Sequence, residues 1–214
     1  MSHDPAHGVV GVLLAGGLSR RMGGGDKSLS SLGGETILSR VKTRALPQVE
    51  TLVLNANGDL DRFAEFDLPV VPDIIEGHAG PLAGVLTGMA WAREHAPHAP
   101  WIATFPTDAP FFPRDLVASL REATDMAGDD LACAGSLGRP HPVFGLWPVW
   151  LYDNLYQAVV DEGVRKIVEW TARFRLVEVD FPPNPIDPFH NVNSPEDLEE
   201  AEKILAGKIL AGQM

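Results

Sequence analysis

The chain has 214 residues, of which 45% are hydrophobic and 21% are charged. This length suits one globular domain, and the composition excludes disorder as the default state. The formal net charge of −12 excludes nucleic acid and anionic membrane surfaces as expected partners, because both would repel the protein. A polyanionic ligand therefore needs a local cluster of basic residues.

The single cysteine, Cys133, excludes a disulfide framework within the chain and a cysteine-based zinc site. Residues 1–8 lack the basic run and apolar core of a signal peptide, and no apolar stretch approaches the length of a membrane span. We therefore expect a cytoplasmic protein. We expect a loose tail at residues 1–8, one domain over residues 9–206 and a C-terminal extension at residues 207–214.

The first half of the chain predicts strands that alternate with helices. Residues 9–14 form a short apolar run that ends at a glycine pair, which is typical of a buried parallel strand. Further strands are expected at residues 51–54 and 69–71. Helices are expected at residues 36–45 and 81–93, the second with apolar residues at helical spacing and a proline at its first position.

The second half continues the alternation. Strands are expected at residues 101–105, 131–134 and 143–147, with a half-buried edge strand at residues 176–181, where apolar and polar residues alternate. Helices are expected at residues 114–124, 151–160 and 164–173. A last helix follows Ser194, whose side chain can form a reciprocal capping box with Asp197.

This alternation predicts an α/β fold with a mostly parallel central sheet flanked by helices, in a single domain. In such sheets, ligands bind beyond the carboxyl ends of the strands. The loops that follow residues 14, 54, 71 and 105 are therefore expected to share one rim.

The loop after the first strand is the strongest local signal for an anionic ligand. It is rich in glycine, so that its backbone can approach a phosphate closely. Its three basic residues, Arg20, Arg21 and Lys27, outnumber the single acid Asp26 in an otherwise acidic chain. The loop matches neither a Walker A motif, since Asp26 stands directly before Lys27, nor the G-x-G-x-x-G fingerprint.

Asp108 follows the strand expected at residues 101–105, so it falls on the same rim. A hard cation such as Mg²⁺ is commonly held by one or two carboxylates together with phosphate oxygens and water. The alternative is a turn aspartate between two prolines. A serine-hydrolase signal around Ser136 is weak, because alanine replaces the first glycine of the nucleophile elbow.

These motifs resemble, in order and along nearly the whole chain, those of molybdenum cofactor guanylyltransferases, the MobA family. The matching segments are Leu14-Ala-Gly-Gly-Leu-Ser-Arg-Arg-Met-Gly-Gly-Gly-Asp-Lys-Ser-Leu29, Val71-Pro-Asp73, Gly80-Pro-Leu-Ala-Gly84, Thr107-Asp-Ala-Pro-Phe111, His141-Pro-Val-Phe-Gly145 and Asn191-Val-Asn-Ser-Pro-Glu-Asp-Leu198. The form of the first motif, together with the ordered set, is more specific than the loose version shared by many nucleotidyltransferases.

The resemblance implies a Rossmann-like nucleotidyltransferase fold, GTP, Mg²⁺ and molybdopterin. The residues that it places at the nucleotide are Leu14, Ala15, Gly16, Gly17, Lys27, Asn55, Asp73 and Asp108, with Asp108 also as the metal ligand. Asn191 and Asn193 match positions expected near the pterin, and the ring of Phe144 is a further candidate there.

The implied reaction transfers GMP from GTP to the phosphate of molybdopterin and releases pyrophosphate. The attacking phosphate oxygen is already anionic and needs no general base, so Lys27, Arg21 and Asp108 are expected to act by charge and position. Alternatives are the same chemistry with CTP or with a sugar phosphate, or a non-catalytic GTP-binding regulator. Proteins of cofactor biosynthesis or molybdoenzyme maturation are further expected partners, through transient contacts.

Overall fold

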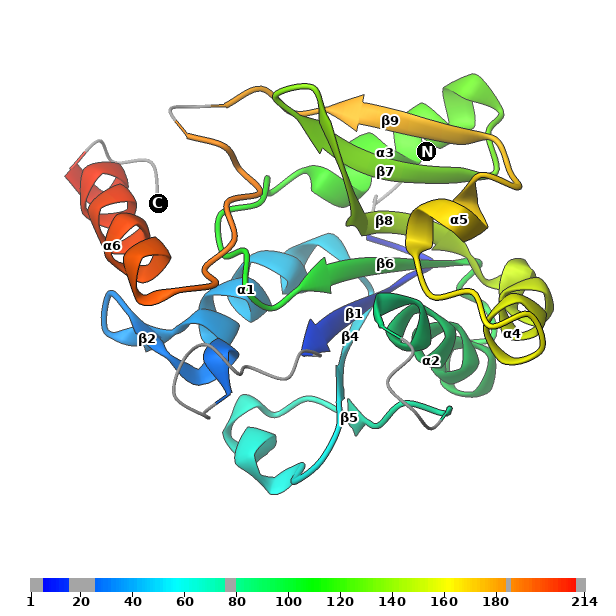
Figure 1. Ribbon diagram of the computed structural model, residues 1–214, viewed down its shortest axis with the longest axis horizontal. Helices are drawn as coiled ribbons and strands as arrows, with labels where there is room; N and C mark the ends of the chain where they lie inside the picture. The colour runs from blue at the N-terminus through cyan, green and yellow to red at the C-terminus, as the bar shows by residue number, and fades with distance from the viewer. Residues whose placement is uncertain (1–5, 16–25, 76–79, 184–185, 211–214) are drawn as a thin grey trace.

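The computed structural model describes residues 6–15, 26–75, 80–183 and 186–210. Its centre is a seven-stranded sheet in the order β5-β4-β1-β6-β8-β7-β9 (Figure 1). The strands are β1 (Val9–Ala15), β4 (Thr51–Ala56), β5 (Val70–Val71), β6 (Trp101–Pro106), β7 (Leu131–Ser136), β8 (Arg139–Pro148) and β9 (Leu176–Asp180). Only β8 runs antiparallel to its neighbours in the described sheet.

Helices cover both faces of this sheet. They are α1 (Ile37–Ala45), α2 (Pro81–His95), α3 (Leu116–Ala127), α4 (Tyr152–Val160), α5 (Ile167–Thr171) and α6 (Pro195–Leu210). Buried side chains of α1, α3 and α6 belong to one apolar cluster, and those of α2, α4 and α5 to another. The predicted single α/β domain with a mostly parallel sheet is therefore confirmed. No helix among the described residues is long and apolar enough to cross a membrane.

The central position of β1 in the sheet explains why its sequence is apolar throughout. It lies between β4 and β6 and pairs with both in parallel. Val9 and Leu13 face one apolar cluster, while Val10 and Val12 face the other. All four of these side chains are fully buried, and only Ala15, at the end of the strand, is partly exposed.

Several predicted elements have different limits in the structure, and two of them show a local reason. β8 begins at Arg139, earlier than the predicted start at residue 143, because a tight hairpin turn at Leu137 and Gly138 pairs the polar residues of β8 with the end of β7. Both turn residues have positive φ, 52° and 70°. The predicted helix at residues 164–173 is shorter, since Lys166 is extended and α5 begins only at Ile167.

The last helix is fixed at its start and along its length. The backbone N–H of Asp197 donates to Ser194 Oγ at 3.2 Å, and the N–H groups of Asn193 and Ser194 both donate to Asp197 Oδ2 at 2.8 Å. This is the predicted capping box. Further along, Leu205 is buried and Glu202 accepts a bond from the backbone N–H of Gly33 at 2.7 Å. α6 therefore holds the segment that precedes it in place.

We expect Asp197→Ala to lower the free energy of unfolding by about 1 kcal/mol at neutral pH, the usual effect of losing a helix cap. The Asn193 N–H, followed by that of Ser194, lowers the pKa of Asp197 below its ordinary value. The stabilisation is then complete above the unfolded pKa of about 3.9 and is lost as pH falls below it. Urea unfolding at about pH 7 and about pH 3 measures both parts.

Glu199→Ala, at an exposed position on the same helix, is the matched control and should change stability little at either pH. An equal loss in the Asp197 variant at both pH values would contradict the role of the ionised carboxylate.

Candidate functional site

The carboxyl ends of β1, β4, β5 and β6 meet along one rim, because these strands are parallel neighbours. The predicted common rim of these strand ends is therefore confirmed. Leu14 and Ala15 end β1 at this rim. The predicted site residues Gly16, Gly17 and Arg21 lie outside the described residues.

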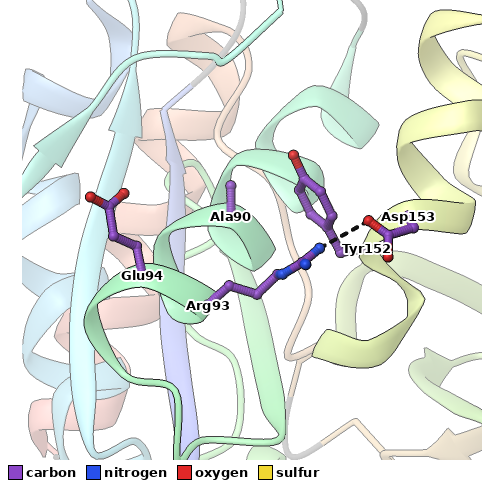
Figure 2. A pocket seen from close by; sticks show the side chains of 5 residues that line it. All are labelled: Ala90, Arg93, Glu94, Tyr152 and Asp153. Atoms are coloured by element: carbon purple, nitrogen blue, oxygen red, sulfur yellow. Dashed lines mark hydrogen bonds and ion pairs between the residues drawn. The ribbon is translucent and has the colours of Figure 1, made fainter.

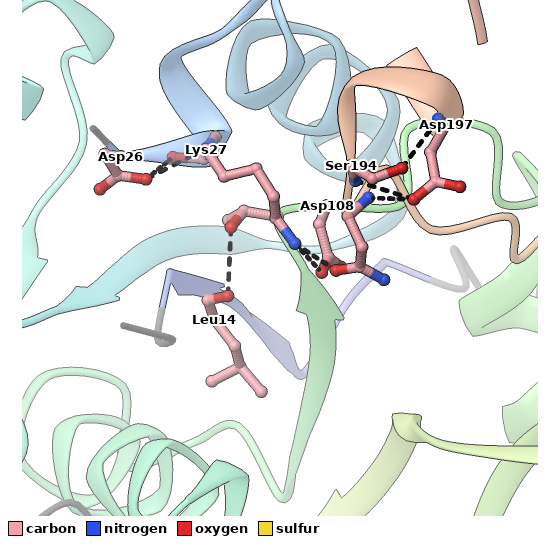
Figure 3. Close-up of polar contacts among 9 residues, drawn as sticks. Leu14, Asp26, Lys27, Asp108, Ser194 and Asp197 are labelled. Carbon is pink, nitrogen blue, oxygen red and sulfur yellow. Dashed lines mark hydrogen bonds and ion pairs between the residues drawn. The ribbon is translucent and has the colours of Figure 1, made fainter. Parts of the chain in front are cut away.

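Lys27 lies at the centre of the polar contacts on the rim (Figure 3). It begins a short 3-10 helix, η1 (Lys27–Leu29), which the side chain of Asp26 caps by accepting from the N–H of Ser28 at 3.1 Å. Its Nζ donates to Asp108 Oδ2 at 2.9 Å and to Asn193 Oδ1. Three segments far apart in the sequence thus meet at one ammonium group.

Backbone contacts fix Asp108 and Asn193 in these positions. Thr107 donates from both its backbone N–H and its hydroxyl to the carbonyl of Leu14, each at 3.3 Å, which ties the end of β6 to β1. The N–H of Val192 donates to the carbonyl of Asp108 at 2.7 Å. The side chains of Lys27 and Asp108 keep 19% and 25% of their exposure, so an incoming ligand can reach both.

A second polar cluster forms where β4 and β5 end. Asp73 accepts from Asn55 Nδ2 at 2.9 Å through one carboxylate oxygen and from Asn57 Nδ2 at 2.8 Å through the other. The backbone N–H of Asp73 donates to Asn57 Oδ1 at 2.9 Å. Asn55 also donates to the carbonyl of Val71 at 3.1 Å. The structure therefore brings the predicted Asn55 and Asp73 together and fixes the orientation of the carboxylate.

Asn57 and Arg62 belong to this region and were not predicted. Arg62 lies in the 3-10 helix η3 (Asp61–Phe66). Its Nε donates to Asp26 at 3.2 Å, and one terminal nitrogen donates to the carbonyl of Asn57 at 3.0 Å. Arg62 thus joins the cluster around Asp73 to the start of η1. A second asparagine two residues after Asn55 could have indicated Asn57 from the sequence alone. The contacts of Arg62 depend on the conformation of the loop and could not.

Helix α2 approaches the rim closely at Gly84. A Cβ atom there would lie 2.4 Å from Leu14 Cδ2 and 2.6 Å from Asn55 Oδ1. Only glycine fits at these distances without moving the helix or its neighbours. Gly84 is therefore a packing residue that lets α2 support two predicted nucleotide-binding positions.

The three residues predicted for the pterin side have different environments. Asn191 and Asn193 are exposed, and Asn193 joins the contacts of Lys27. Phe144 is only 2% exposed and packs between the rings of Phe112 and Phe189, with centroids 5.6 and 4.8 Å away. Phe144 is therefore a core residue here, and the prediction that its ring shelters a pterin needs correction. An aromatic residue in a strand pattern does not reveal which face it occupies.

Ser136 is hydrogen-bonded to both His141 and Asp187, the residue types of a hydrolase triad, but the arrangement is wrong for a nucleophile. Its Oγ lies 2.7 Å from His141 Nε2 and 2.7 Å from Asp187 Oδ1. The carboxylate can only accept, so the serine proton points to Asp187 and not to the histidine. Ser136 is also 1% exposed. The cluster does not have the order Ser-His-Asp that activates a serine.

The rim suits a metal ion that arrives with a substrate. Among the described residues, no three His, Cys, Asp or Glu side chains are grouped to hold a metal by themselves. One carboxylate, Asp108, and one amide oxygen, Asn193 Oδ1, do converge there, since both accept from Lys27. Hard oxygen donors of this kind suit Mg²⁺ when phosphate and water complete its coordination.

A shallow hollow elsewhere on the surface does not belong to this site. Ala90, Arg93, Glu94, Tyr152 and Asp153 line it, and Arg93 points across it to Asp153 at 3.0 Å (Figure 2). It lies at the C-terminal end of α2. The rim contacts α2 near its N-terminal end instead, at Gly84.

Comparison with known proteins agrees with this geometry. The family model described as "MobA-like NTP transferase domain" matches residues 11–176. A molybdenum cofactor guanylyltransferase from Bradyrhizobium sp. (strain ORS 278) is 51% identical over 206 residues, which are 96% of this chain and 97% of that protein.

Two solved structures share the fold. Molybdopterin-guanine dinucleotide biosynthesis protein A from Archaeoglobus fulgidus superposes with a TM-score of 0.71 at 24% identity, covering 93% of this chain and 99% of that chain. A manganese complex of a Mycobacterium tuberculosis protein superposes with a TM-score of 0.66 at 20% identity, covering 91% and 98%. With an α/β fold, a polar rim at the parallel strand ends and this family match, the chain belongs to the MobA-like NTP transferase family and is a nucleotidyltransferase.

Proposed function

We propose that this chain transfers GMP from GTP to the phosphate of molybdopterin, releasing pyrophosphate. The observation that carries the proposal is the meeting of Lys27, Asp108 and Asn193, from three separate segments, at one point of the rim. The names of its relatives agree with this reaction. The acidic charge and single cysteine of the chain fit an enzyme of the cytoplasm.

In this reaction, an oxygen of the acceptor phosphate forms a bond to the α-phosphorus of GTP. The bond from that phosphorus to the β-phosphate oxygen breaks, and pyrophosphate leaves with the electron pair. The attacking oxygen is already anionic, so the protein must hold two anions together and balance the charge of the leaving group. Among the described residues, Lys27 is placed to balance this charge, because its ammonium group lies among oxygen atoms on the rim.

Asp108 is the group that would hold Mg²⁺ together with the nucleotide phosphates. A bound Mg²⁺ would neutralise phosphate charge and favour departure of pyrophosphate. In the structure, the ammonium group of Lys27 donates to Asp108 and to Asn193. When phosphate binds, it offers Lys27 a competing anion, so that the ammonium can turn from Asp108 to the substrate while the carboxylate remains on the rim.

Asp73 is the group we assign to guanine. Guanine presents two donors, N1–H and the N2 amino group, on one edge, and cytosine lacks this pair. Asn55 and Asn57 hold the two carboxylate oxygens of Asp73 from one side. A carboxylate has about four acceptor positions, so capacity remains for both guanine donors. Because the carboxylate is oriented before binding, it selects the base without a loop rearrangement.

We expect Asp108→Asn to reduce GMP transfer at least about a hundredfold while the fold survives, since metal-assisted charge stabilisation contributes several kcal/mol. The assay follows radiolabelled GTP into the dinucleotide product, with thermal unfolding measured in parallel. Asp115→Asn, at an exposed acid beyond the same loop, is the matched control and should retain activity. Near-normal turnover of the Asp108 variant would remove this carboxylate from the mechanism.

We expect wild type to prefer GTP over CTP by one to two decades in kcat/KM, because an unpaired polar group at the base costs roughly 1–3 kcal/mol. Asp73→Ala should shrink that preference more than it weakens triphosphate binding. Asp61→Ala, at an exposed acid that begins η3, should leave the preference intact. Equal use of CTP by wild type would favour a cytidylyltransferase, and binding of GTP without any transfer would favour a regulator.

A further inference from the structure

Ser136, His141 and Asp187 form a polar cluster that the proposed chemistry does not use; Ser136 is buried, and the other two are half-buried. Ser136 ends β7, His141 lies on β8 and Asp187 belongs to the segment between β9 and α6. Both hydrogen bonds of the Ser136 hydroxyl are 2.7 Å long. The hydroxyl therefore joins the β7–β8 hairpin to a segment about fifty residues further along the chain.

The proton positions in this cluster follow from its chemistry. Ser136 has one proton, which it donates to the acceptor Asp187, so His141 must donate its Nε2–H to the serine oxygen. Burial lowers the pKa of His141, opposed by the charges of Asp187 and Glu178 and aided by Arg139. The neutral ring then carries its single proton on Nε2. The result is a directed chain from His141 through Ser136 to Asp187.

Asp187 passes this restraint to its own segment. Its Oδ1 also accepts from the backbone N–H of Phe189 at 3.0 Å, and its carbonyl accepts from that of His190 at 3.2 Å. The turn presses the Phe189 ring against His141, with centroids 4.6 Å apart, and against Phe144 at 4.8 Å. One end of residues 186–193 is thus fixed on the hairpin.

The other end of residues 186–193 is fixed at the rim. The N–H of Val192 donates to the carbonyl of Asp108, and Asn193 accepts from Lys27. The exposed Asn191 lies between these two attachments and the turn at Asp187. The position of Asn191 and Asn193 relative to Lys27 therefore depends on the attachment to Ser136 as well as on the rim contacts.

We propose that Ser136, His141 and Asp187 are positioning residues for the acceptor substrate: their hydrogen-bonded chain holds residues 186–193 so that Asn191 and Asn193 face an incoming pterin phosphate. This inference rests on the proposed function. The three side chains act through the segment and touch neither substrate. Small displacements of positioning groups are costly. Because this segment carries the residues assigned to the acceptor, its displacement should weaken binding of the acceptor and not of GTP.

The test is steady-state kinetics of the full-length protein with Ser136→Ala, with molybdopterin and GTP varied in turn. We expect the KM for molybdopterin to rise at least about tenfold, with the dissociation constant for GTP, measured by calorimetry, unchanged within about twofold. Asp187→Ala should reproduce this effect. Asp187→Asn should restore most of the wild-type affinity for molybdopterin, because an amide oxygen still accepts from Ser136 and Phe189.

The matched control is Thr104→Val. Thr104 is also 1% exposed, and its hydroxyl bonds the carbonyl of Val143 on β8 and the indole N–H of Trp147. Its loss should lower the melting temperature without raising the KM for molybdopterin selectively. If Ser136→Ala behaves like this control, or raises both substrate constants equally, the residues are merely structural and the proposal is overturned.

Hydrogen exchange separates this inference from the proposed function. In Ser136→Ala, the amides of Phe189 and Val192 should exchange faster, while those of β1 keep their protection. If wild type transfers no GMP to molybdopterin, the proposed function fails, and the acceptor role fails with it. Unchanged exchange at Phe189 and Val192 would overturn the restraint itself, whatever the activity.

Discussion

The site depends on one interaction, the ammonium group of Lys27 shared between Asp108 and Asn193. In a chain of formal charge −12, a carboxylate on the rim would repel a triphosphate. Lys27 neutralises this carboxylate before a ligand arrives, and the exposure that both side chains keep leaves the pair open to exchange. The same ammonium also connects the start of the chain with its last segment. Lys27 thus balances the charge of Asp108 and joins three described segments of the chain.

The rest of the fold supports this arrangement at short range. Thr107 ties β6 to β1, Val192 ties residues 186–193 to Asp108, and the capping box of α6 begins at the residue after Asn193. The bonds from the N–H groups of Thr107 and Val192 run between backbone atoms, so they fix the chain path independently of side-chain rotamers. Loops that carry functional groups are ordinarily the mobile part of a domain. Here the chain is attached within one residue of Asp108, through Thr107, and of Asn193, through Val192.

Much of this could be predicted from the sequence, because the relevant signals are local. The apolar run of β1, the proline that begins α2 and the Ser194–Asp197 capping box each follow from a few neighbouring residues. Parallel strands then place Asn55 and Asp108 on one rim without any knowledge of contacts.

The remaining features depend on contacts between distant segments. Asn193 meets Lys27 across 166 positions, and Ser136 meets Asp187 across 51. No local pattern encodes such a pairing. Phe144 shows the same limit, since its motif was recognised but its burial depends on Phe112 and Phe189 packing over it. The guanidinium of Arg62 has several acceptors, and these exist only once the loop after β4 has folded.

Arg62 also links two parts of the rim that lie apart in the sequence. Through Asp26 and the carbonyl of Asn57, its guanidinium fixes the separation between the base cluster and the start of η1. Under the proposed function, Asp73 binds the base and Lys27 the phosphates, so the spacing between these two groups is set during folding. The entropy cost of ordering Asp26, Asn57 and Arg62 relative to one another then belongs to the folding equilibrium. A nucleotide whose base and phosphates did not match that spacing would engage only one of the two groups, so the folded chain would select its substrate by length.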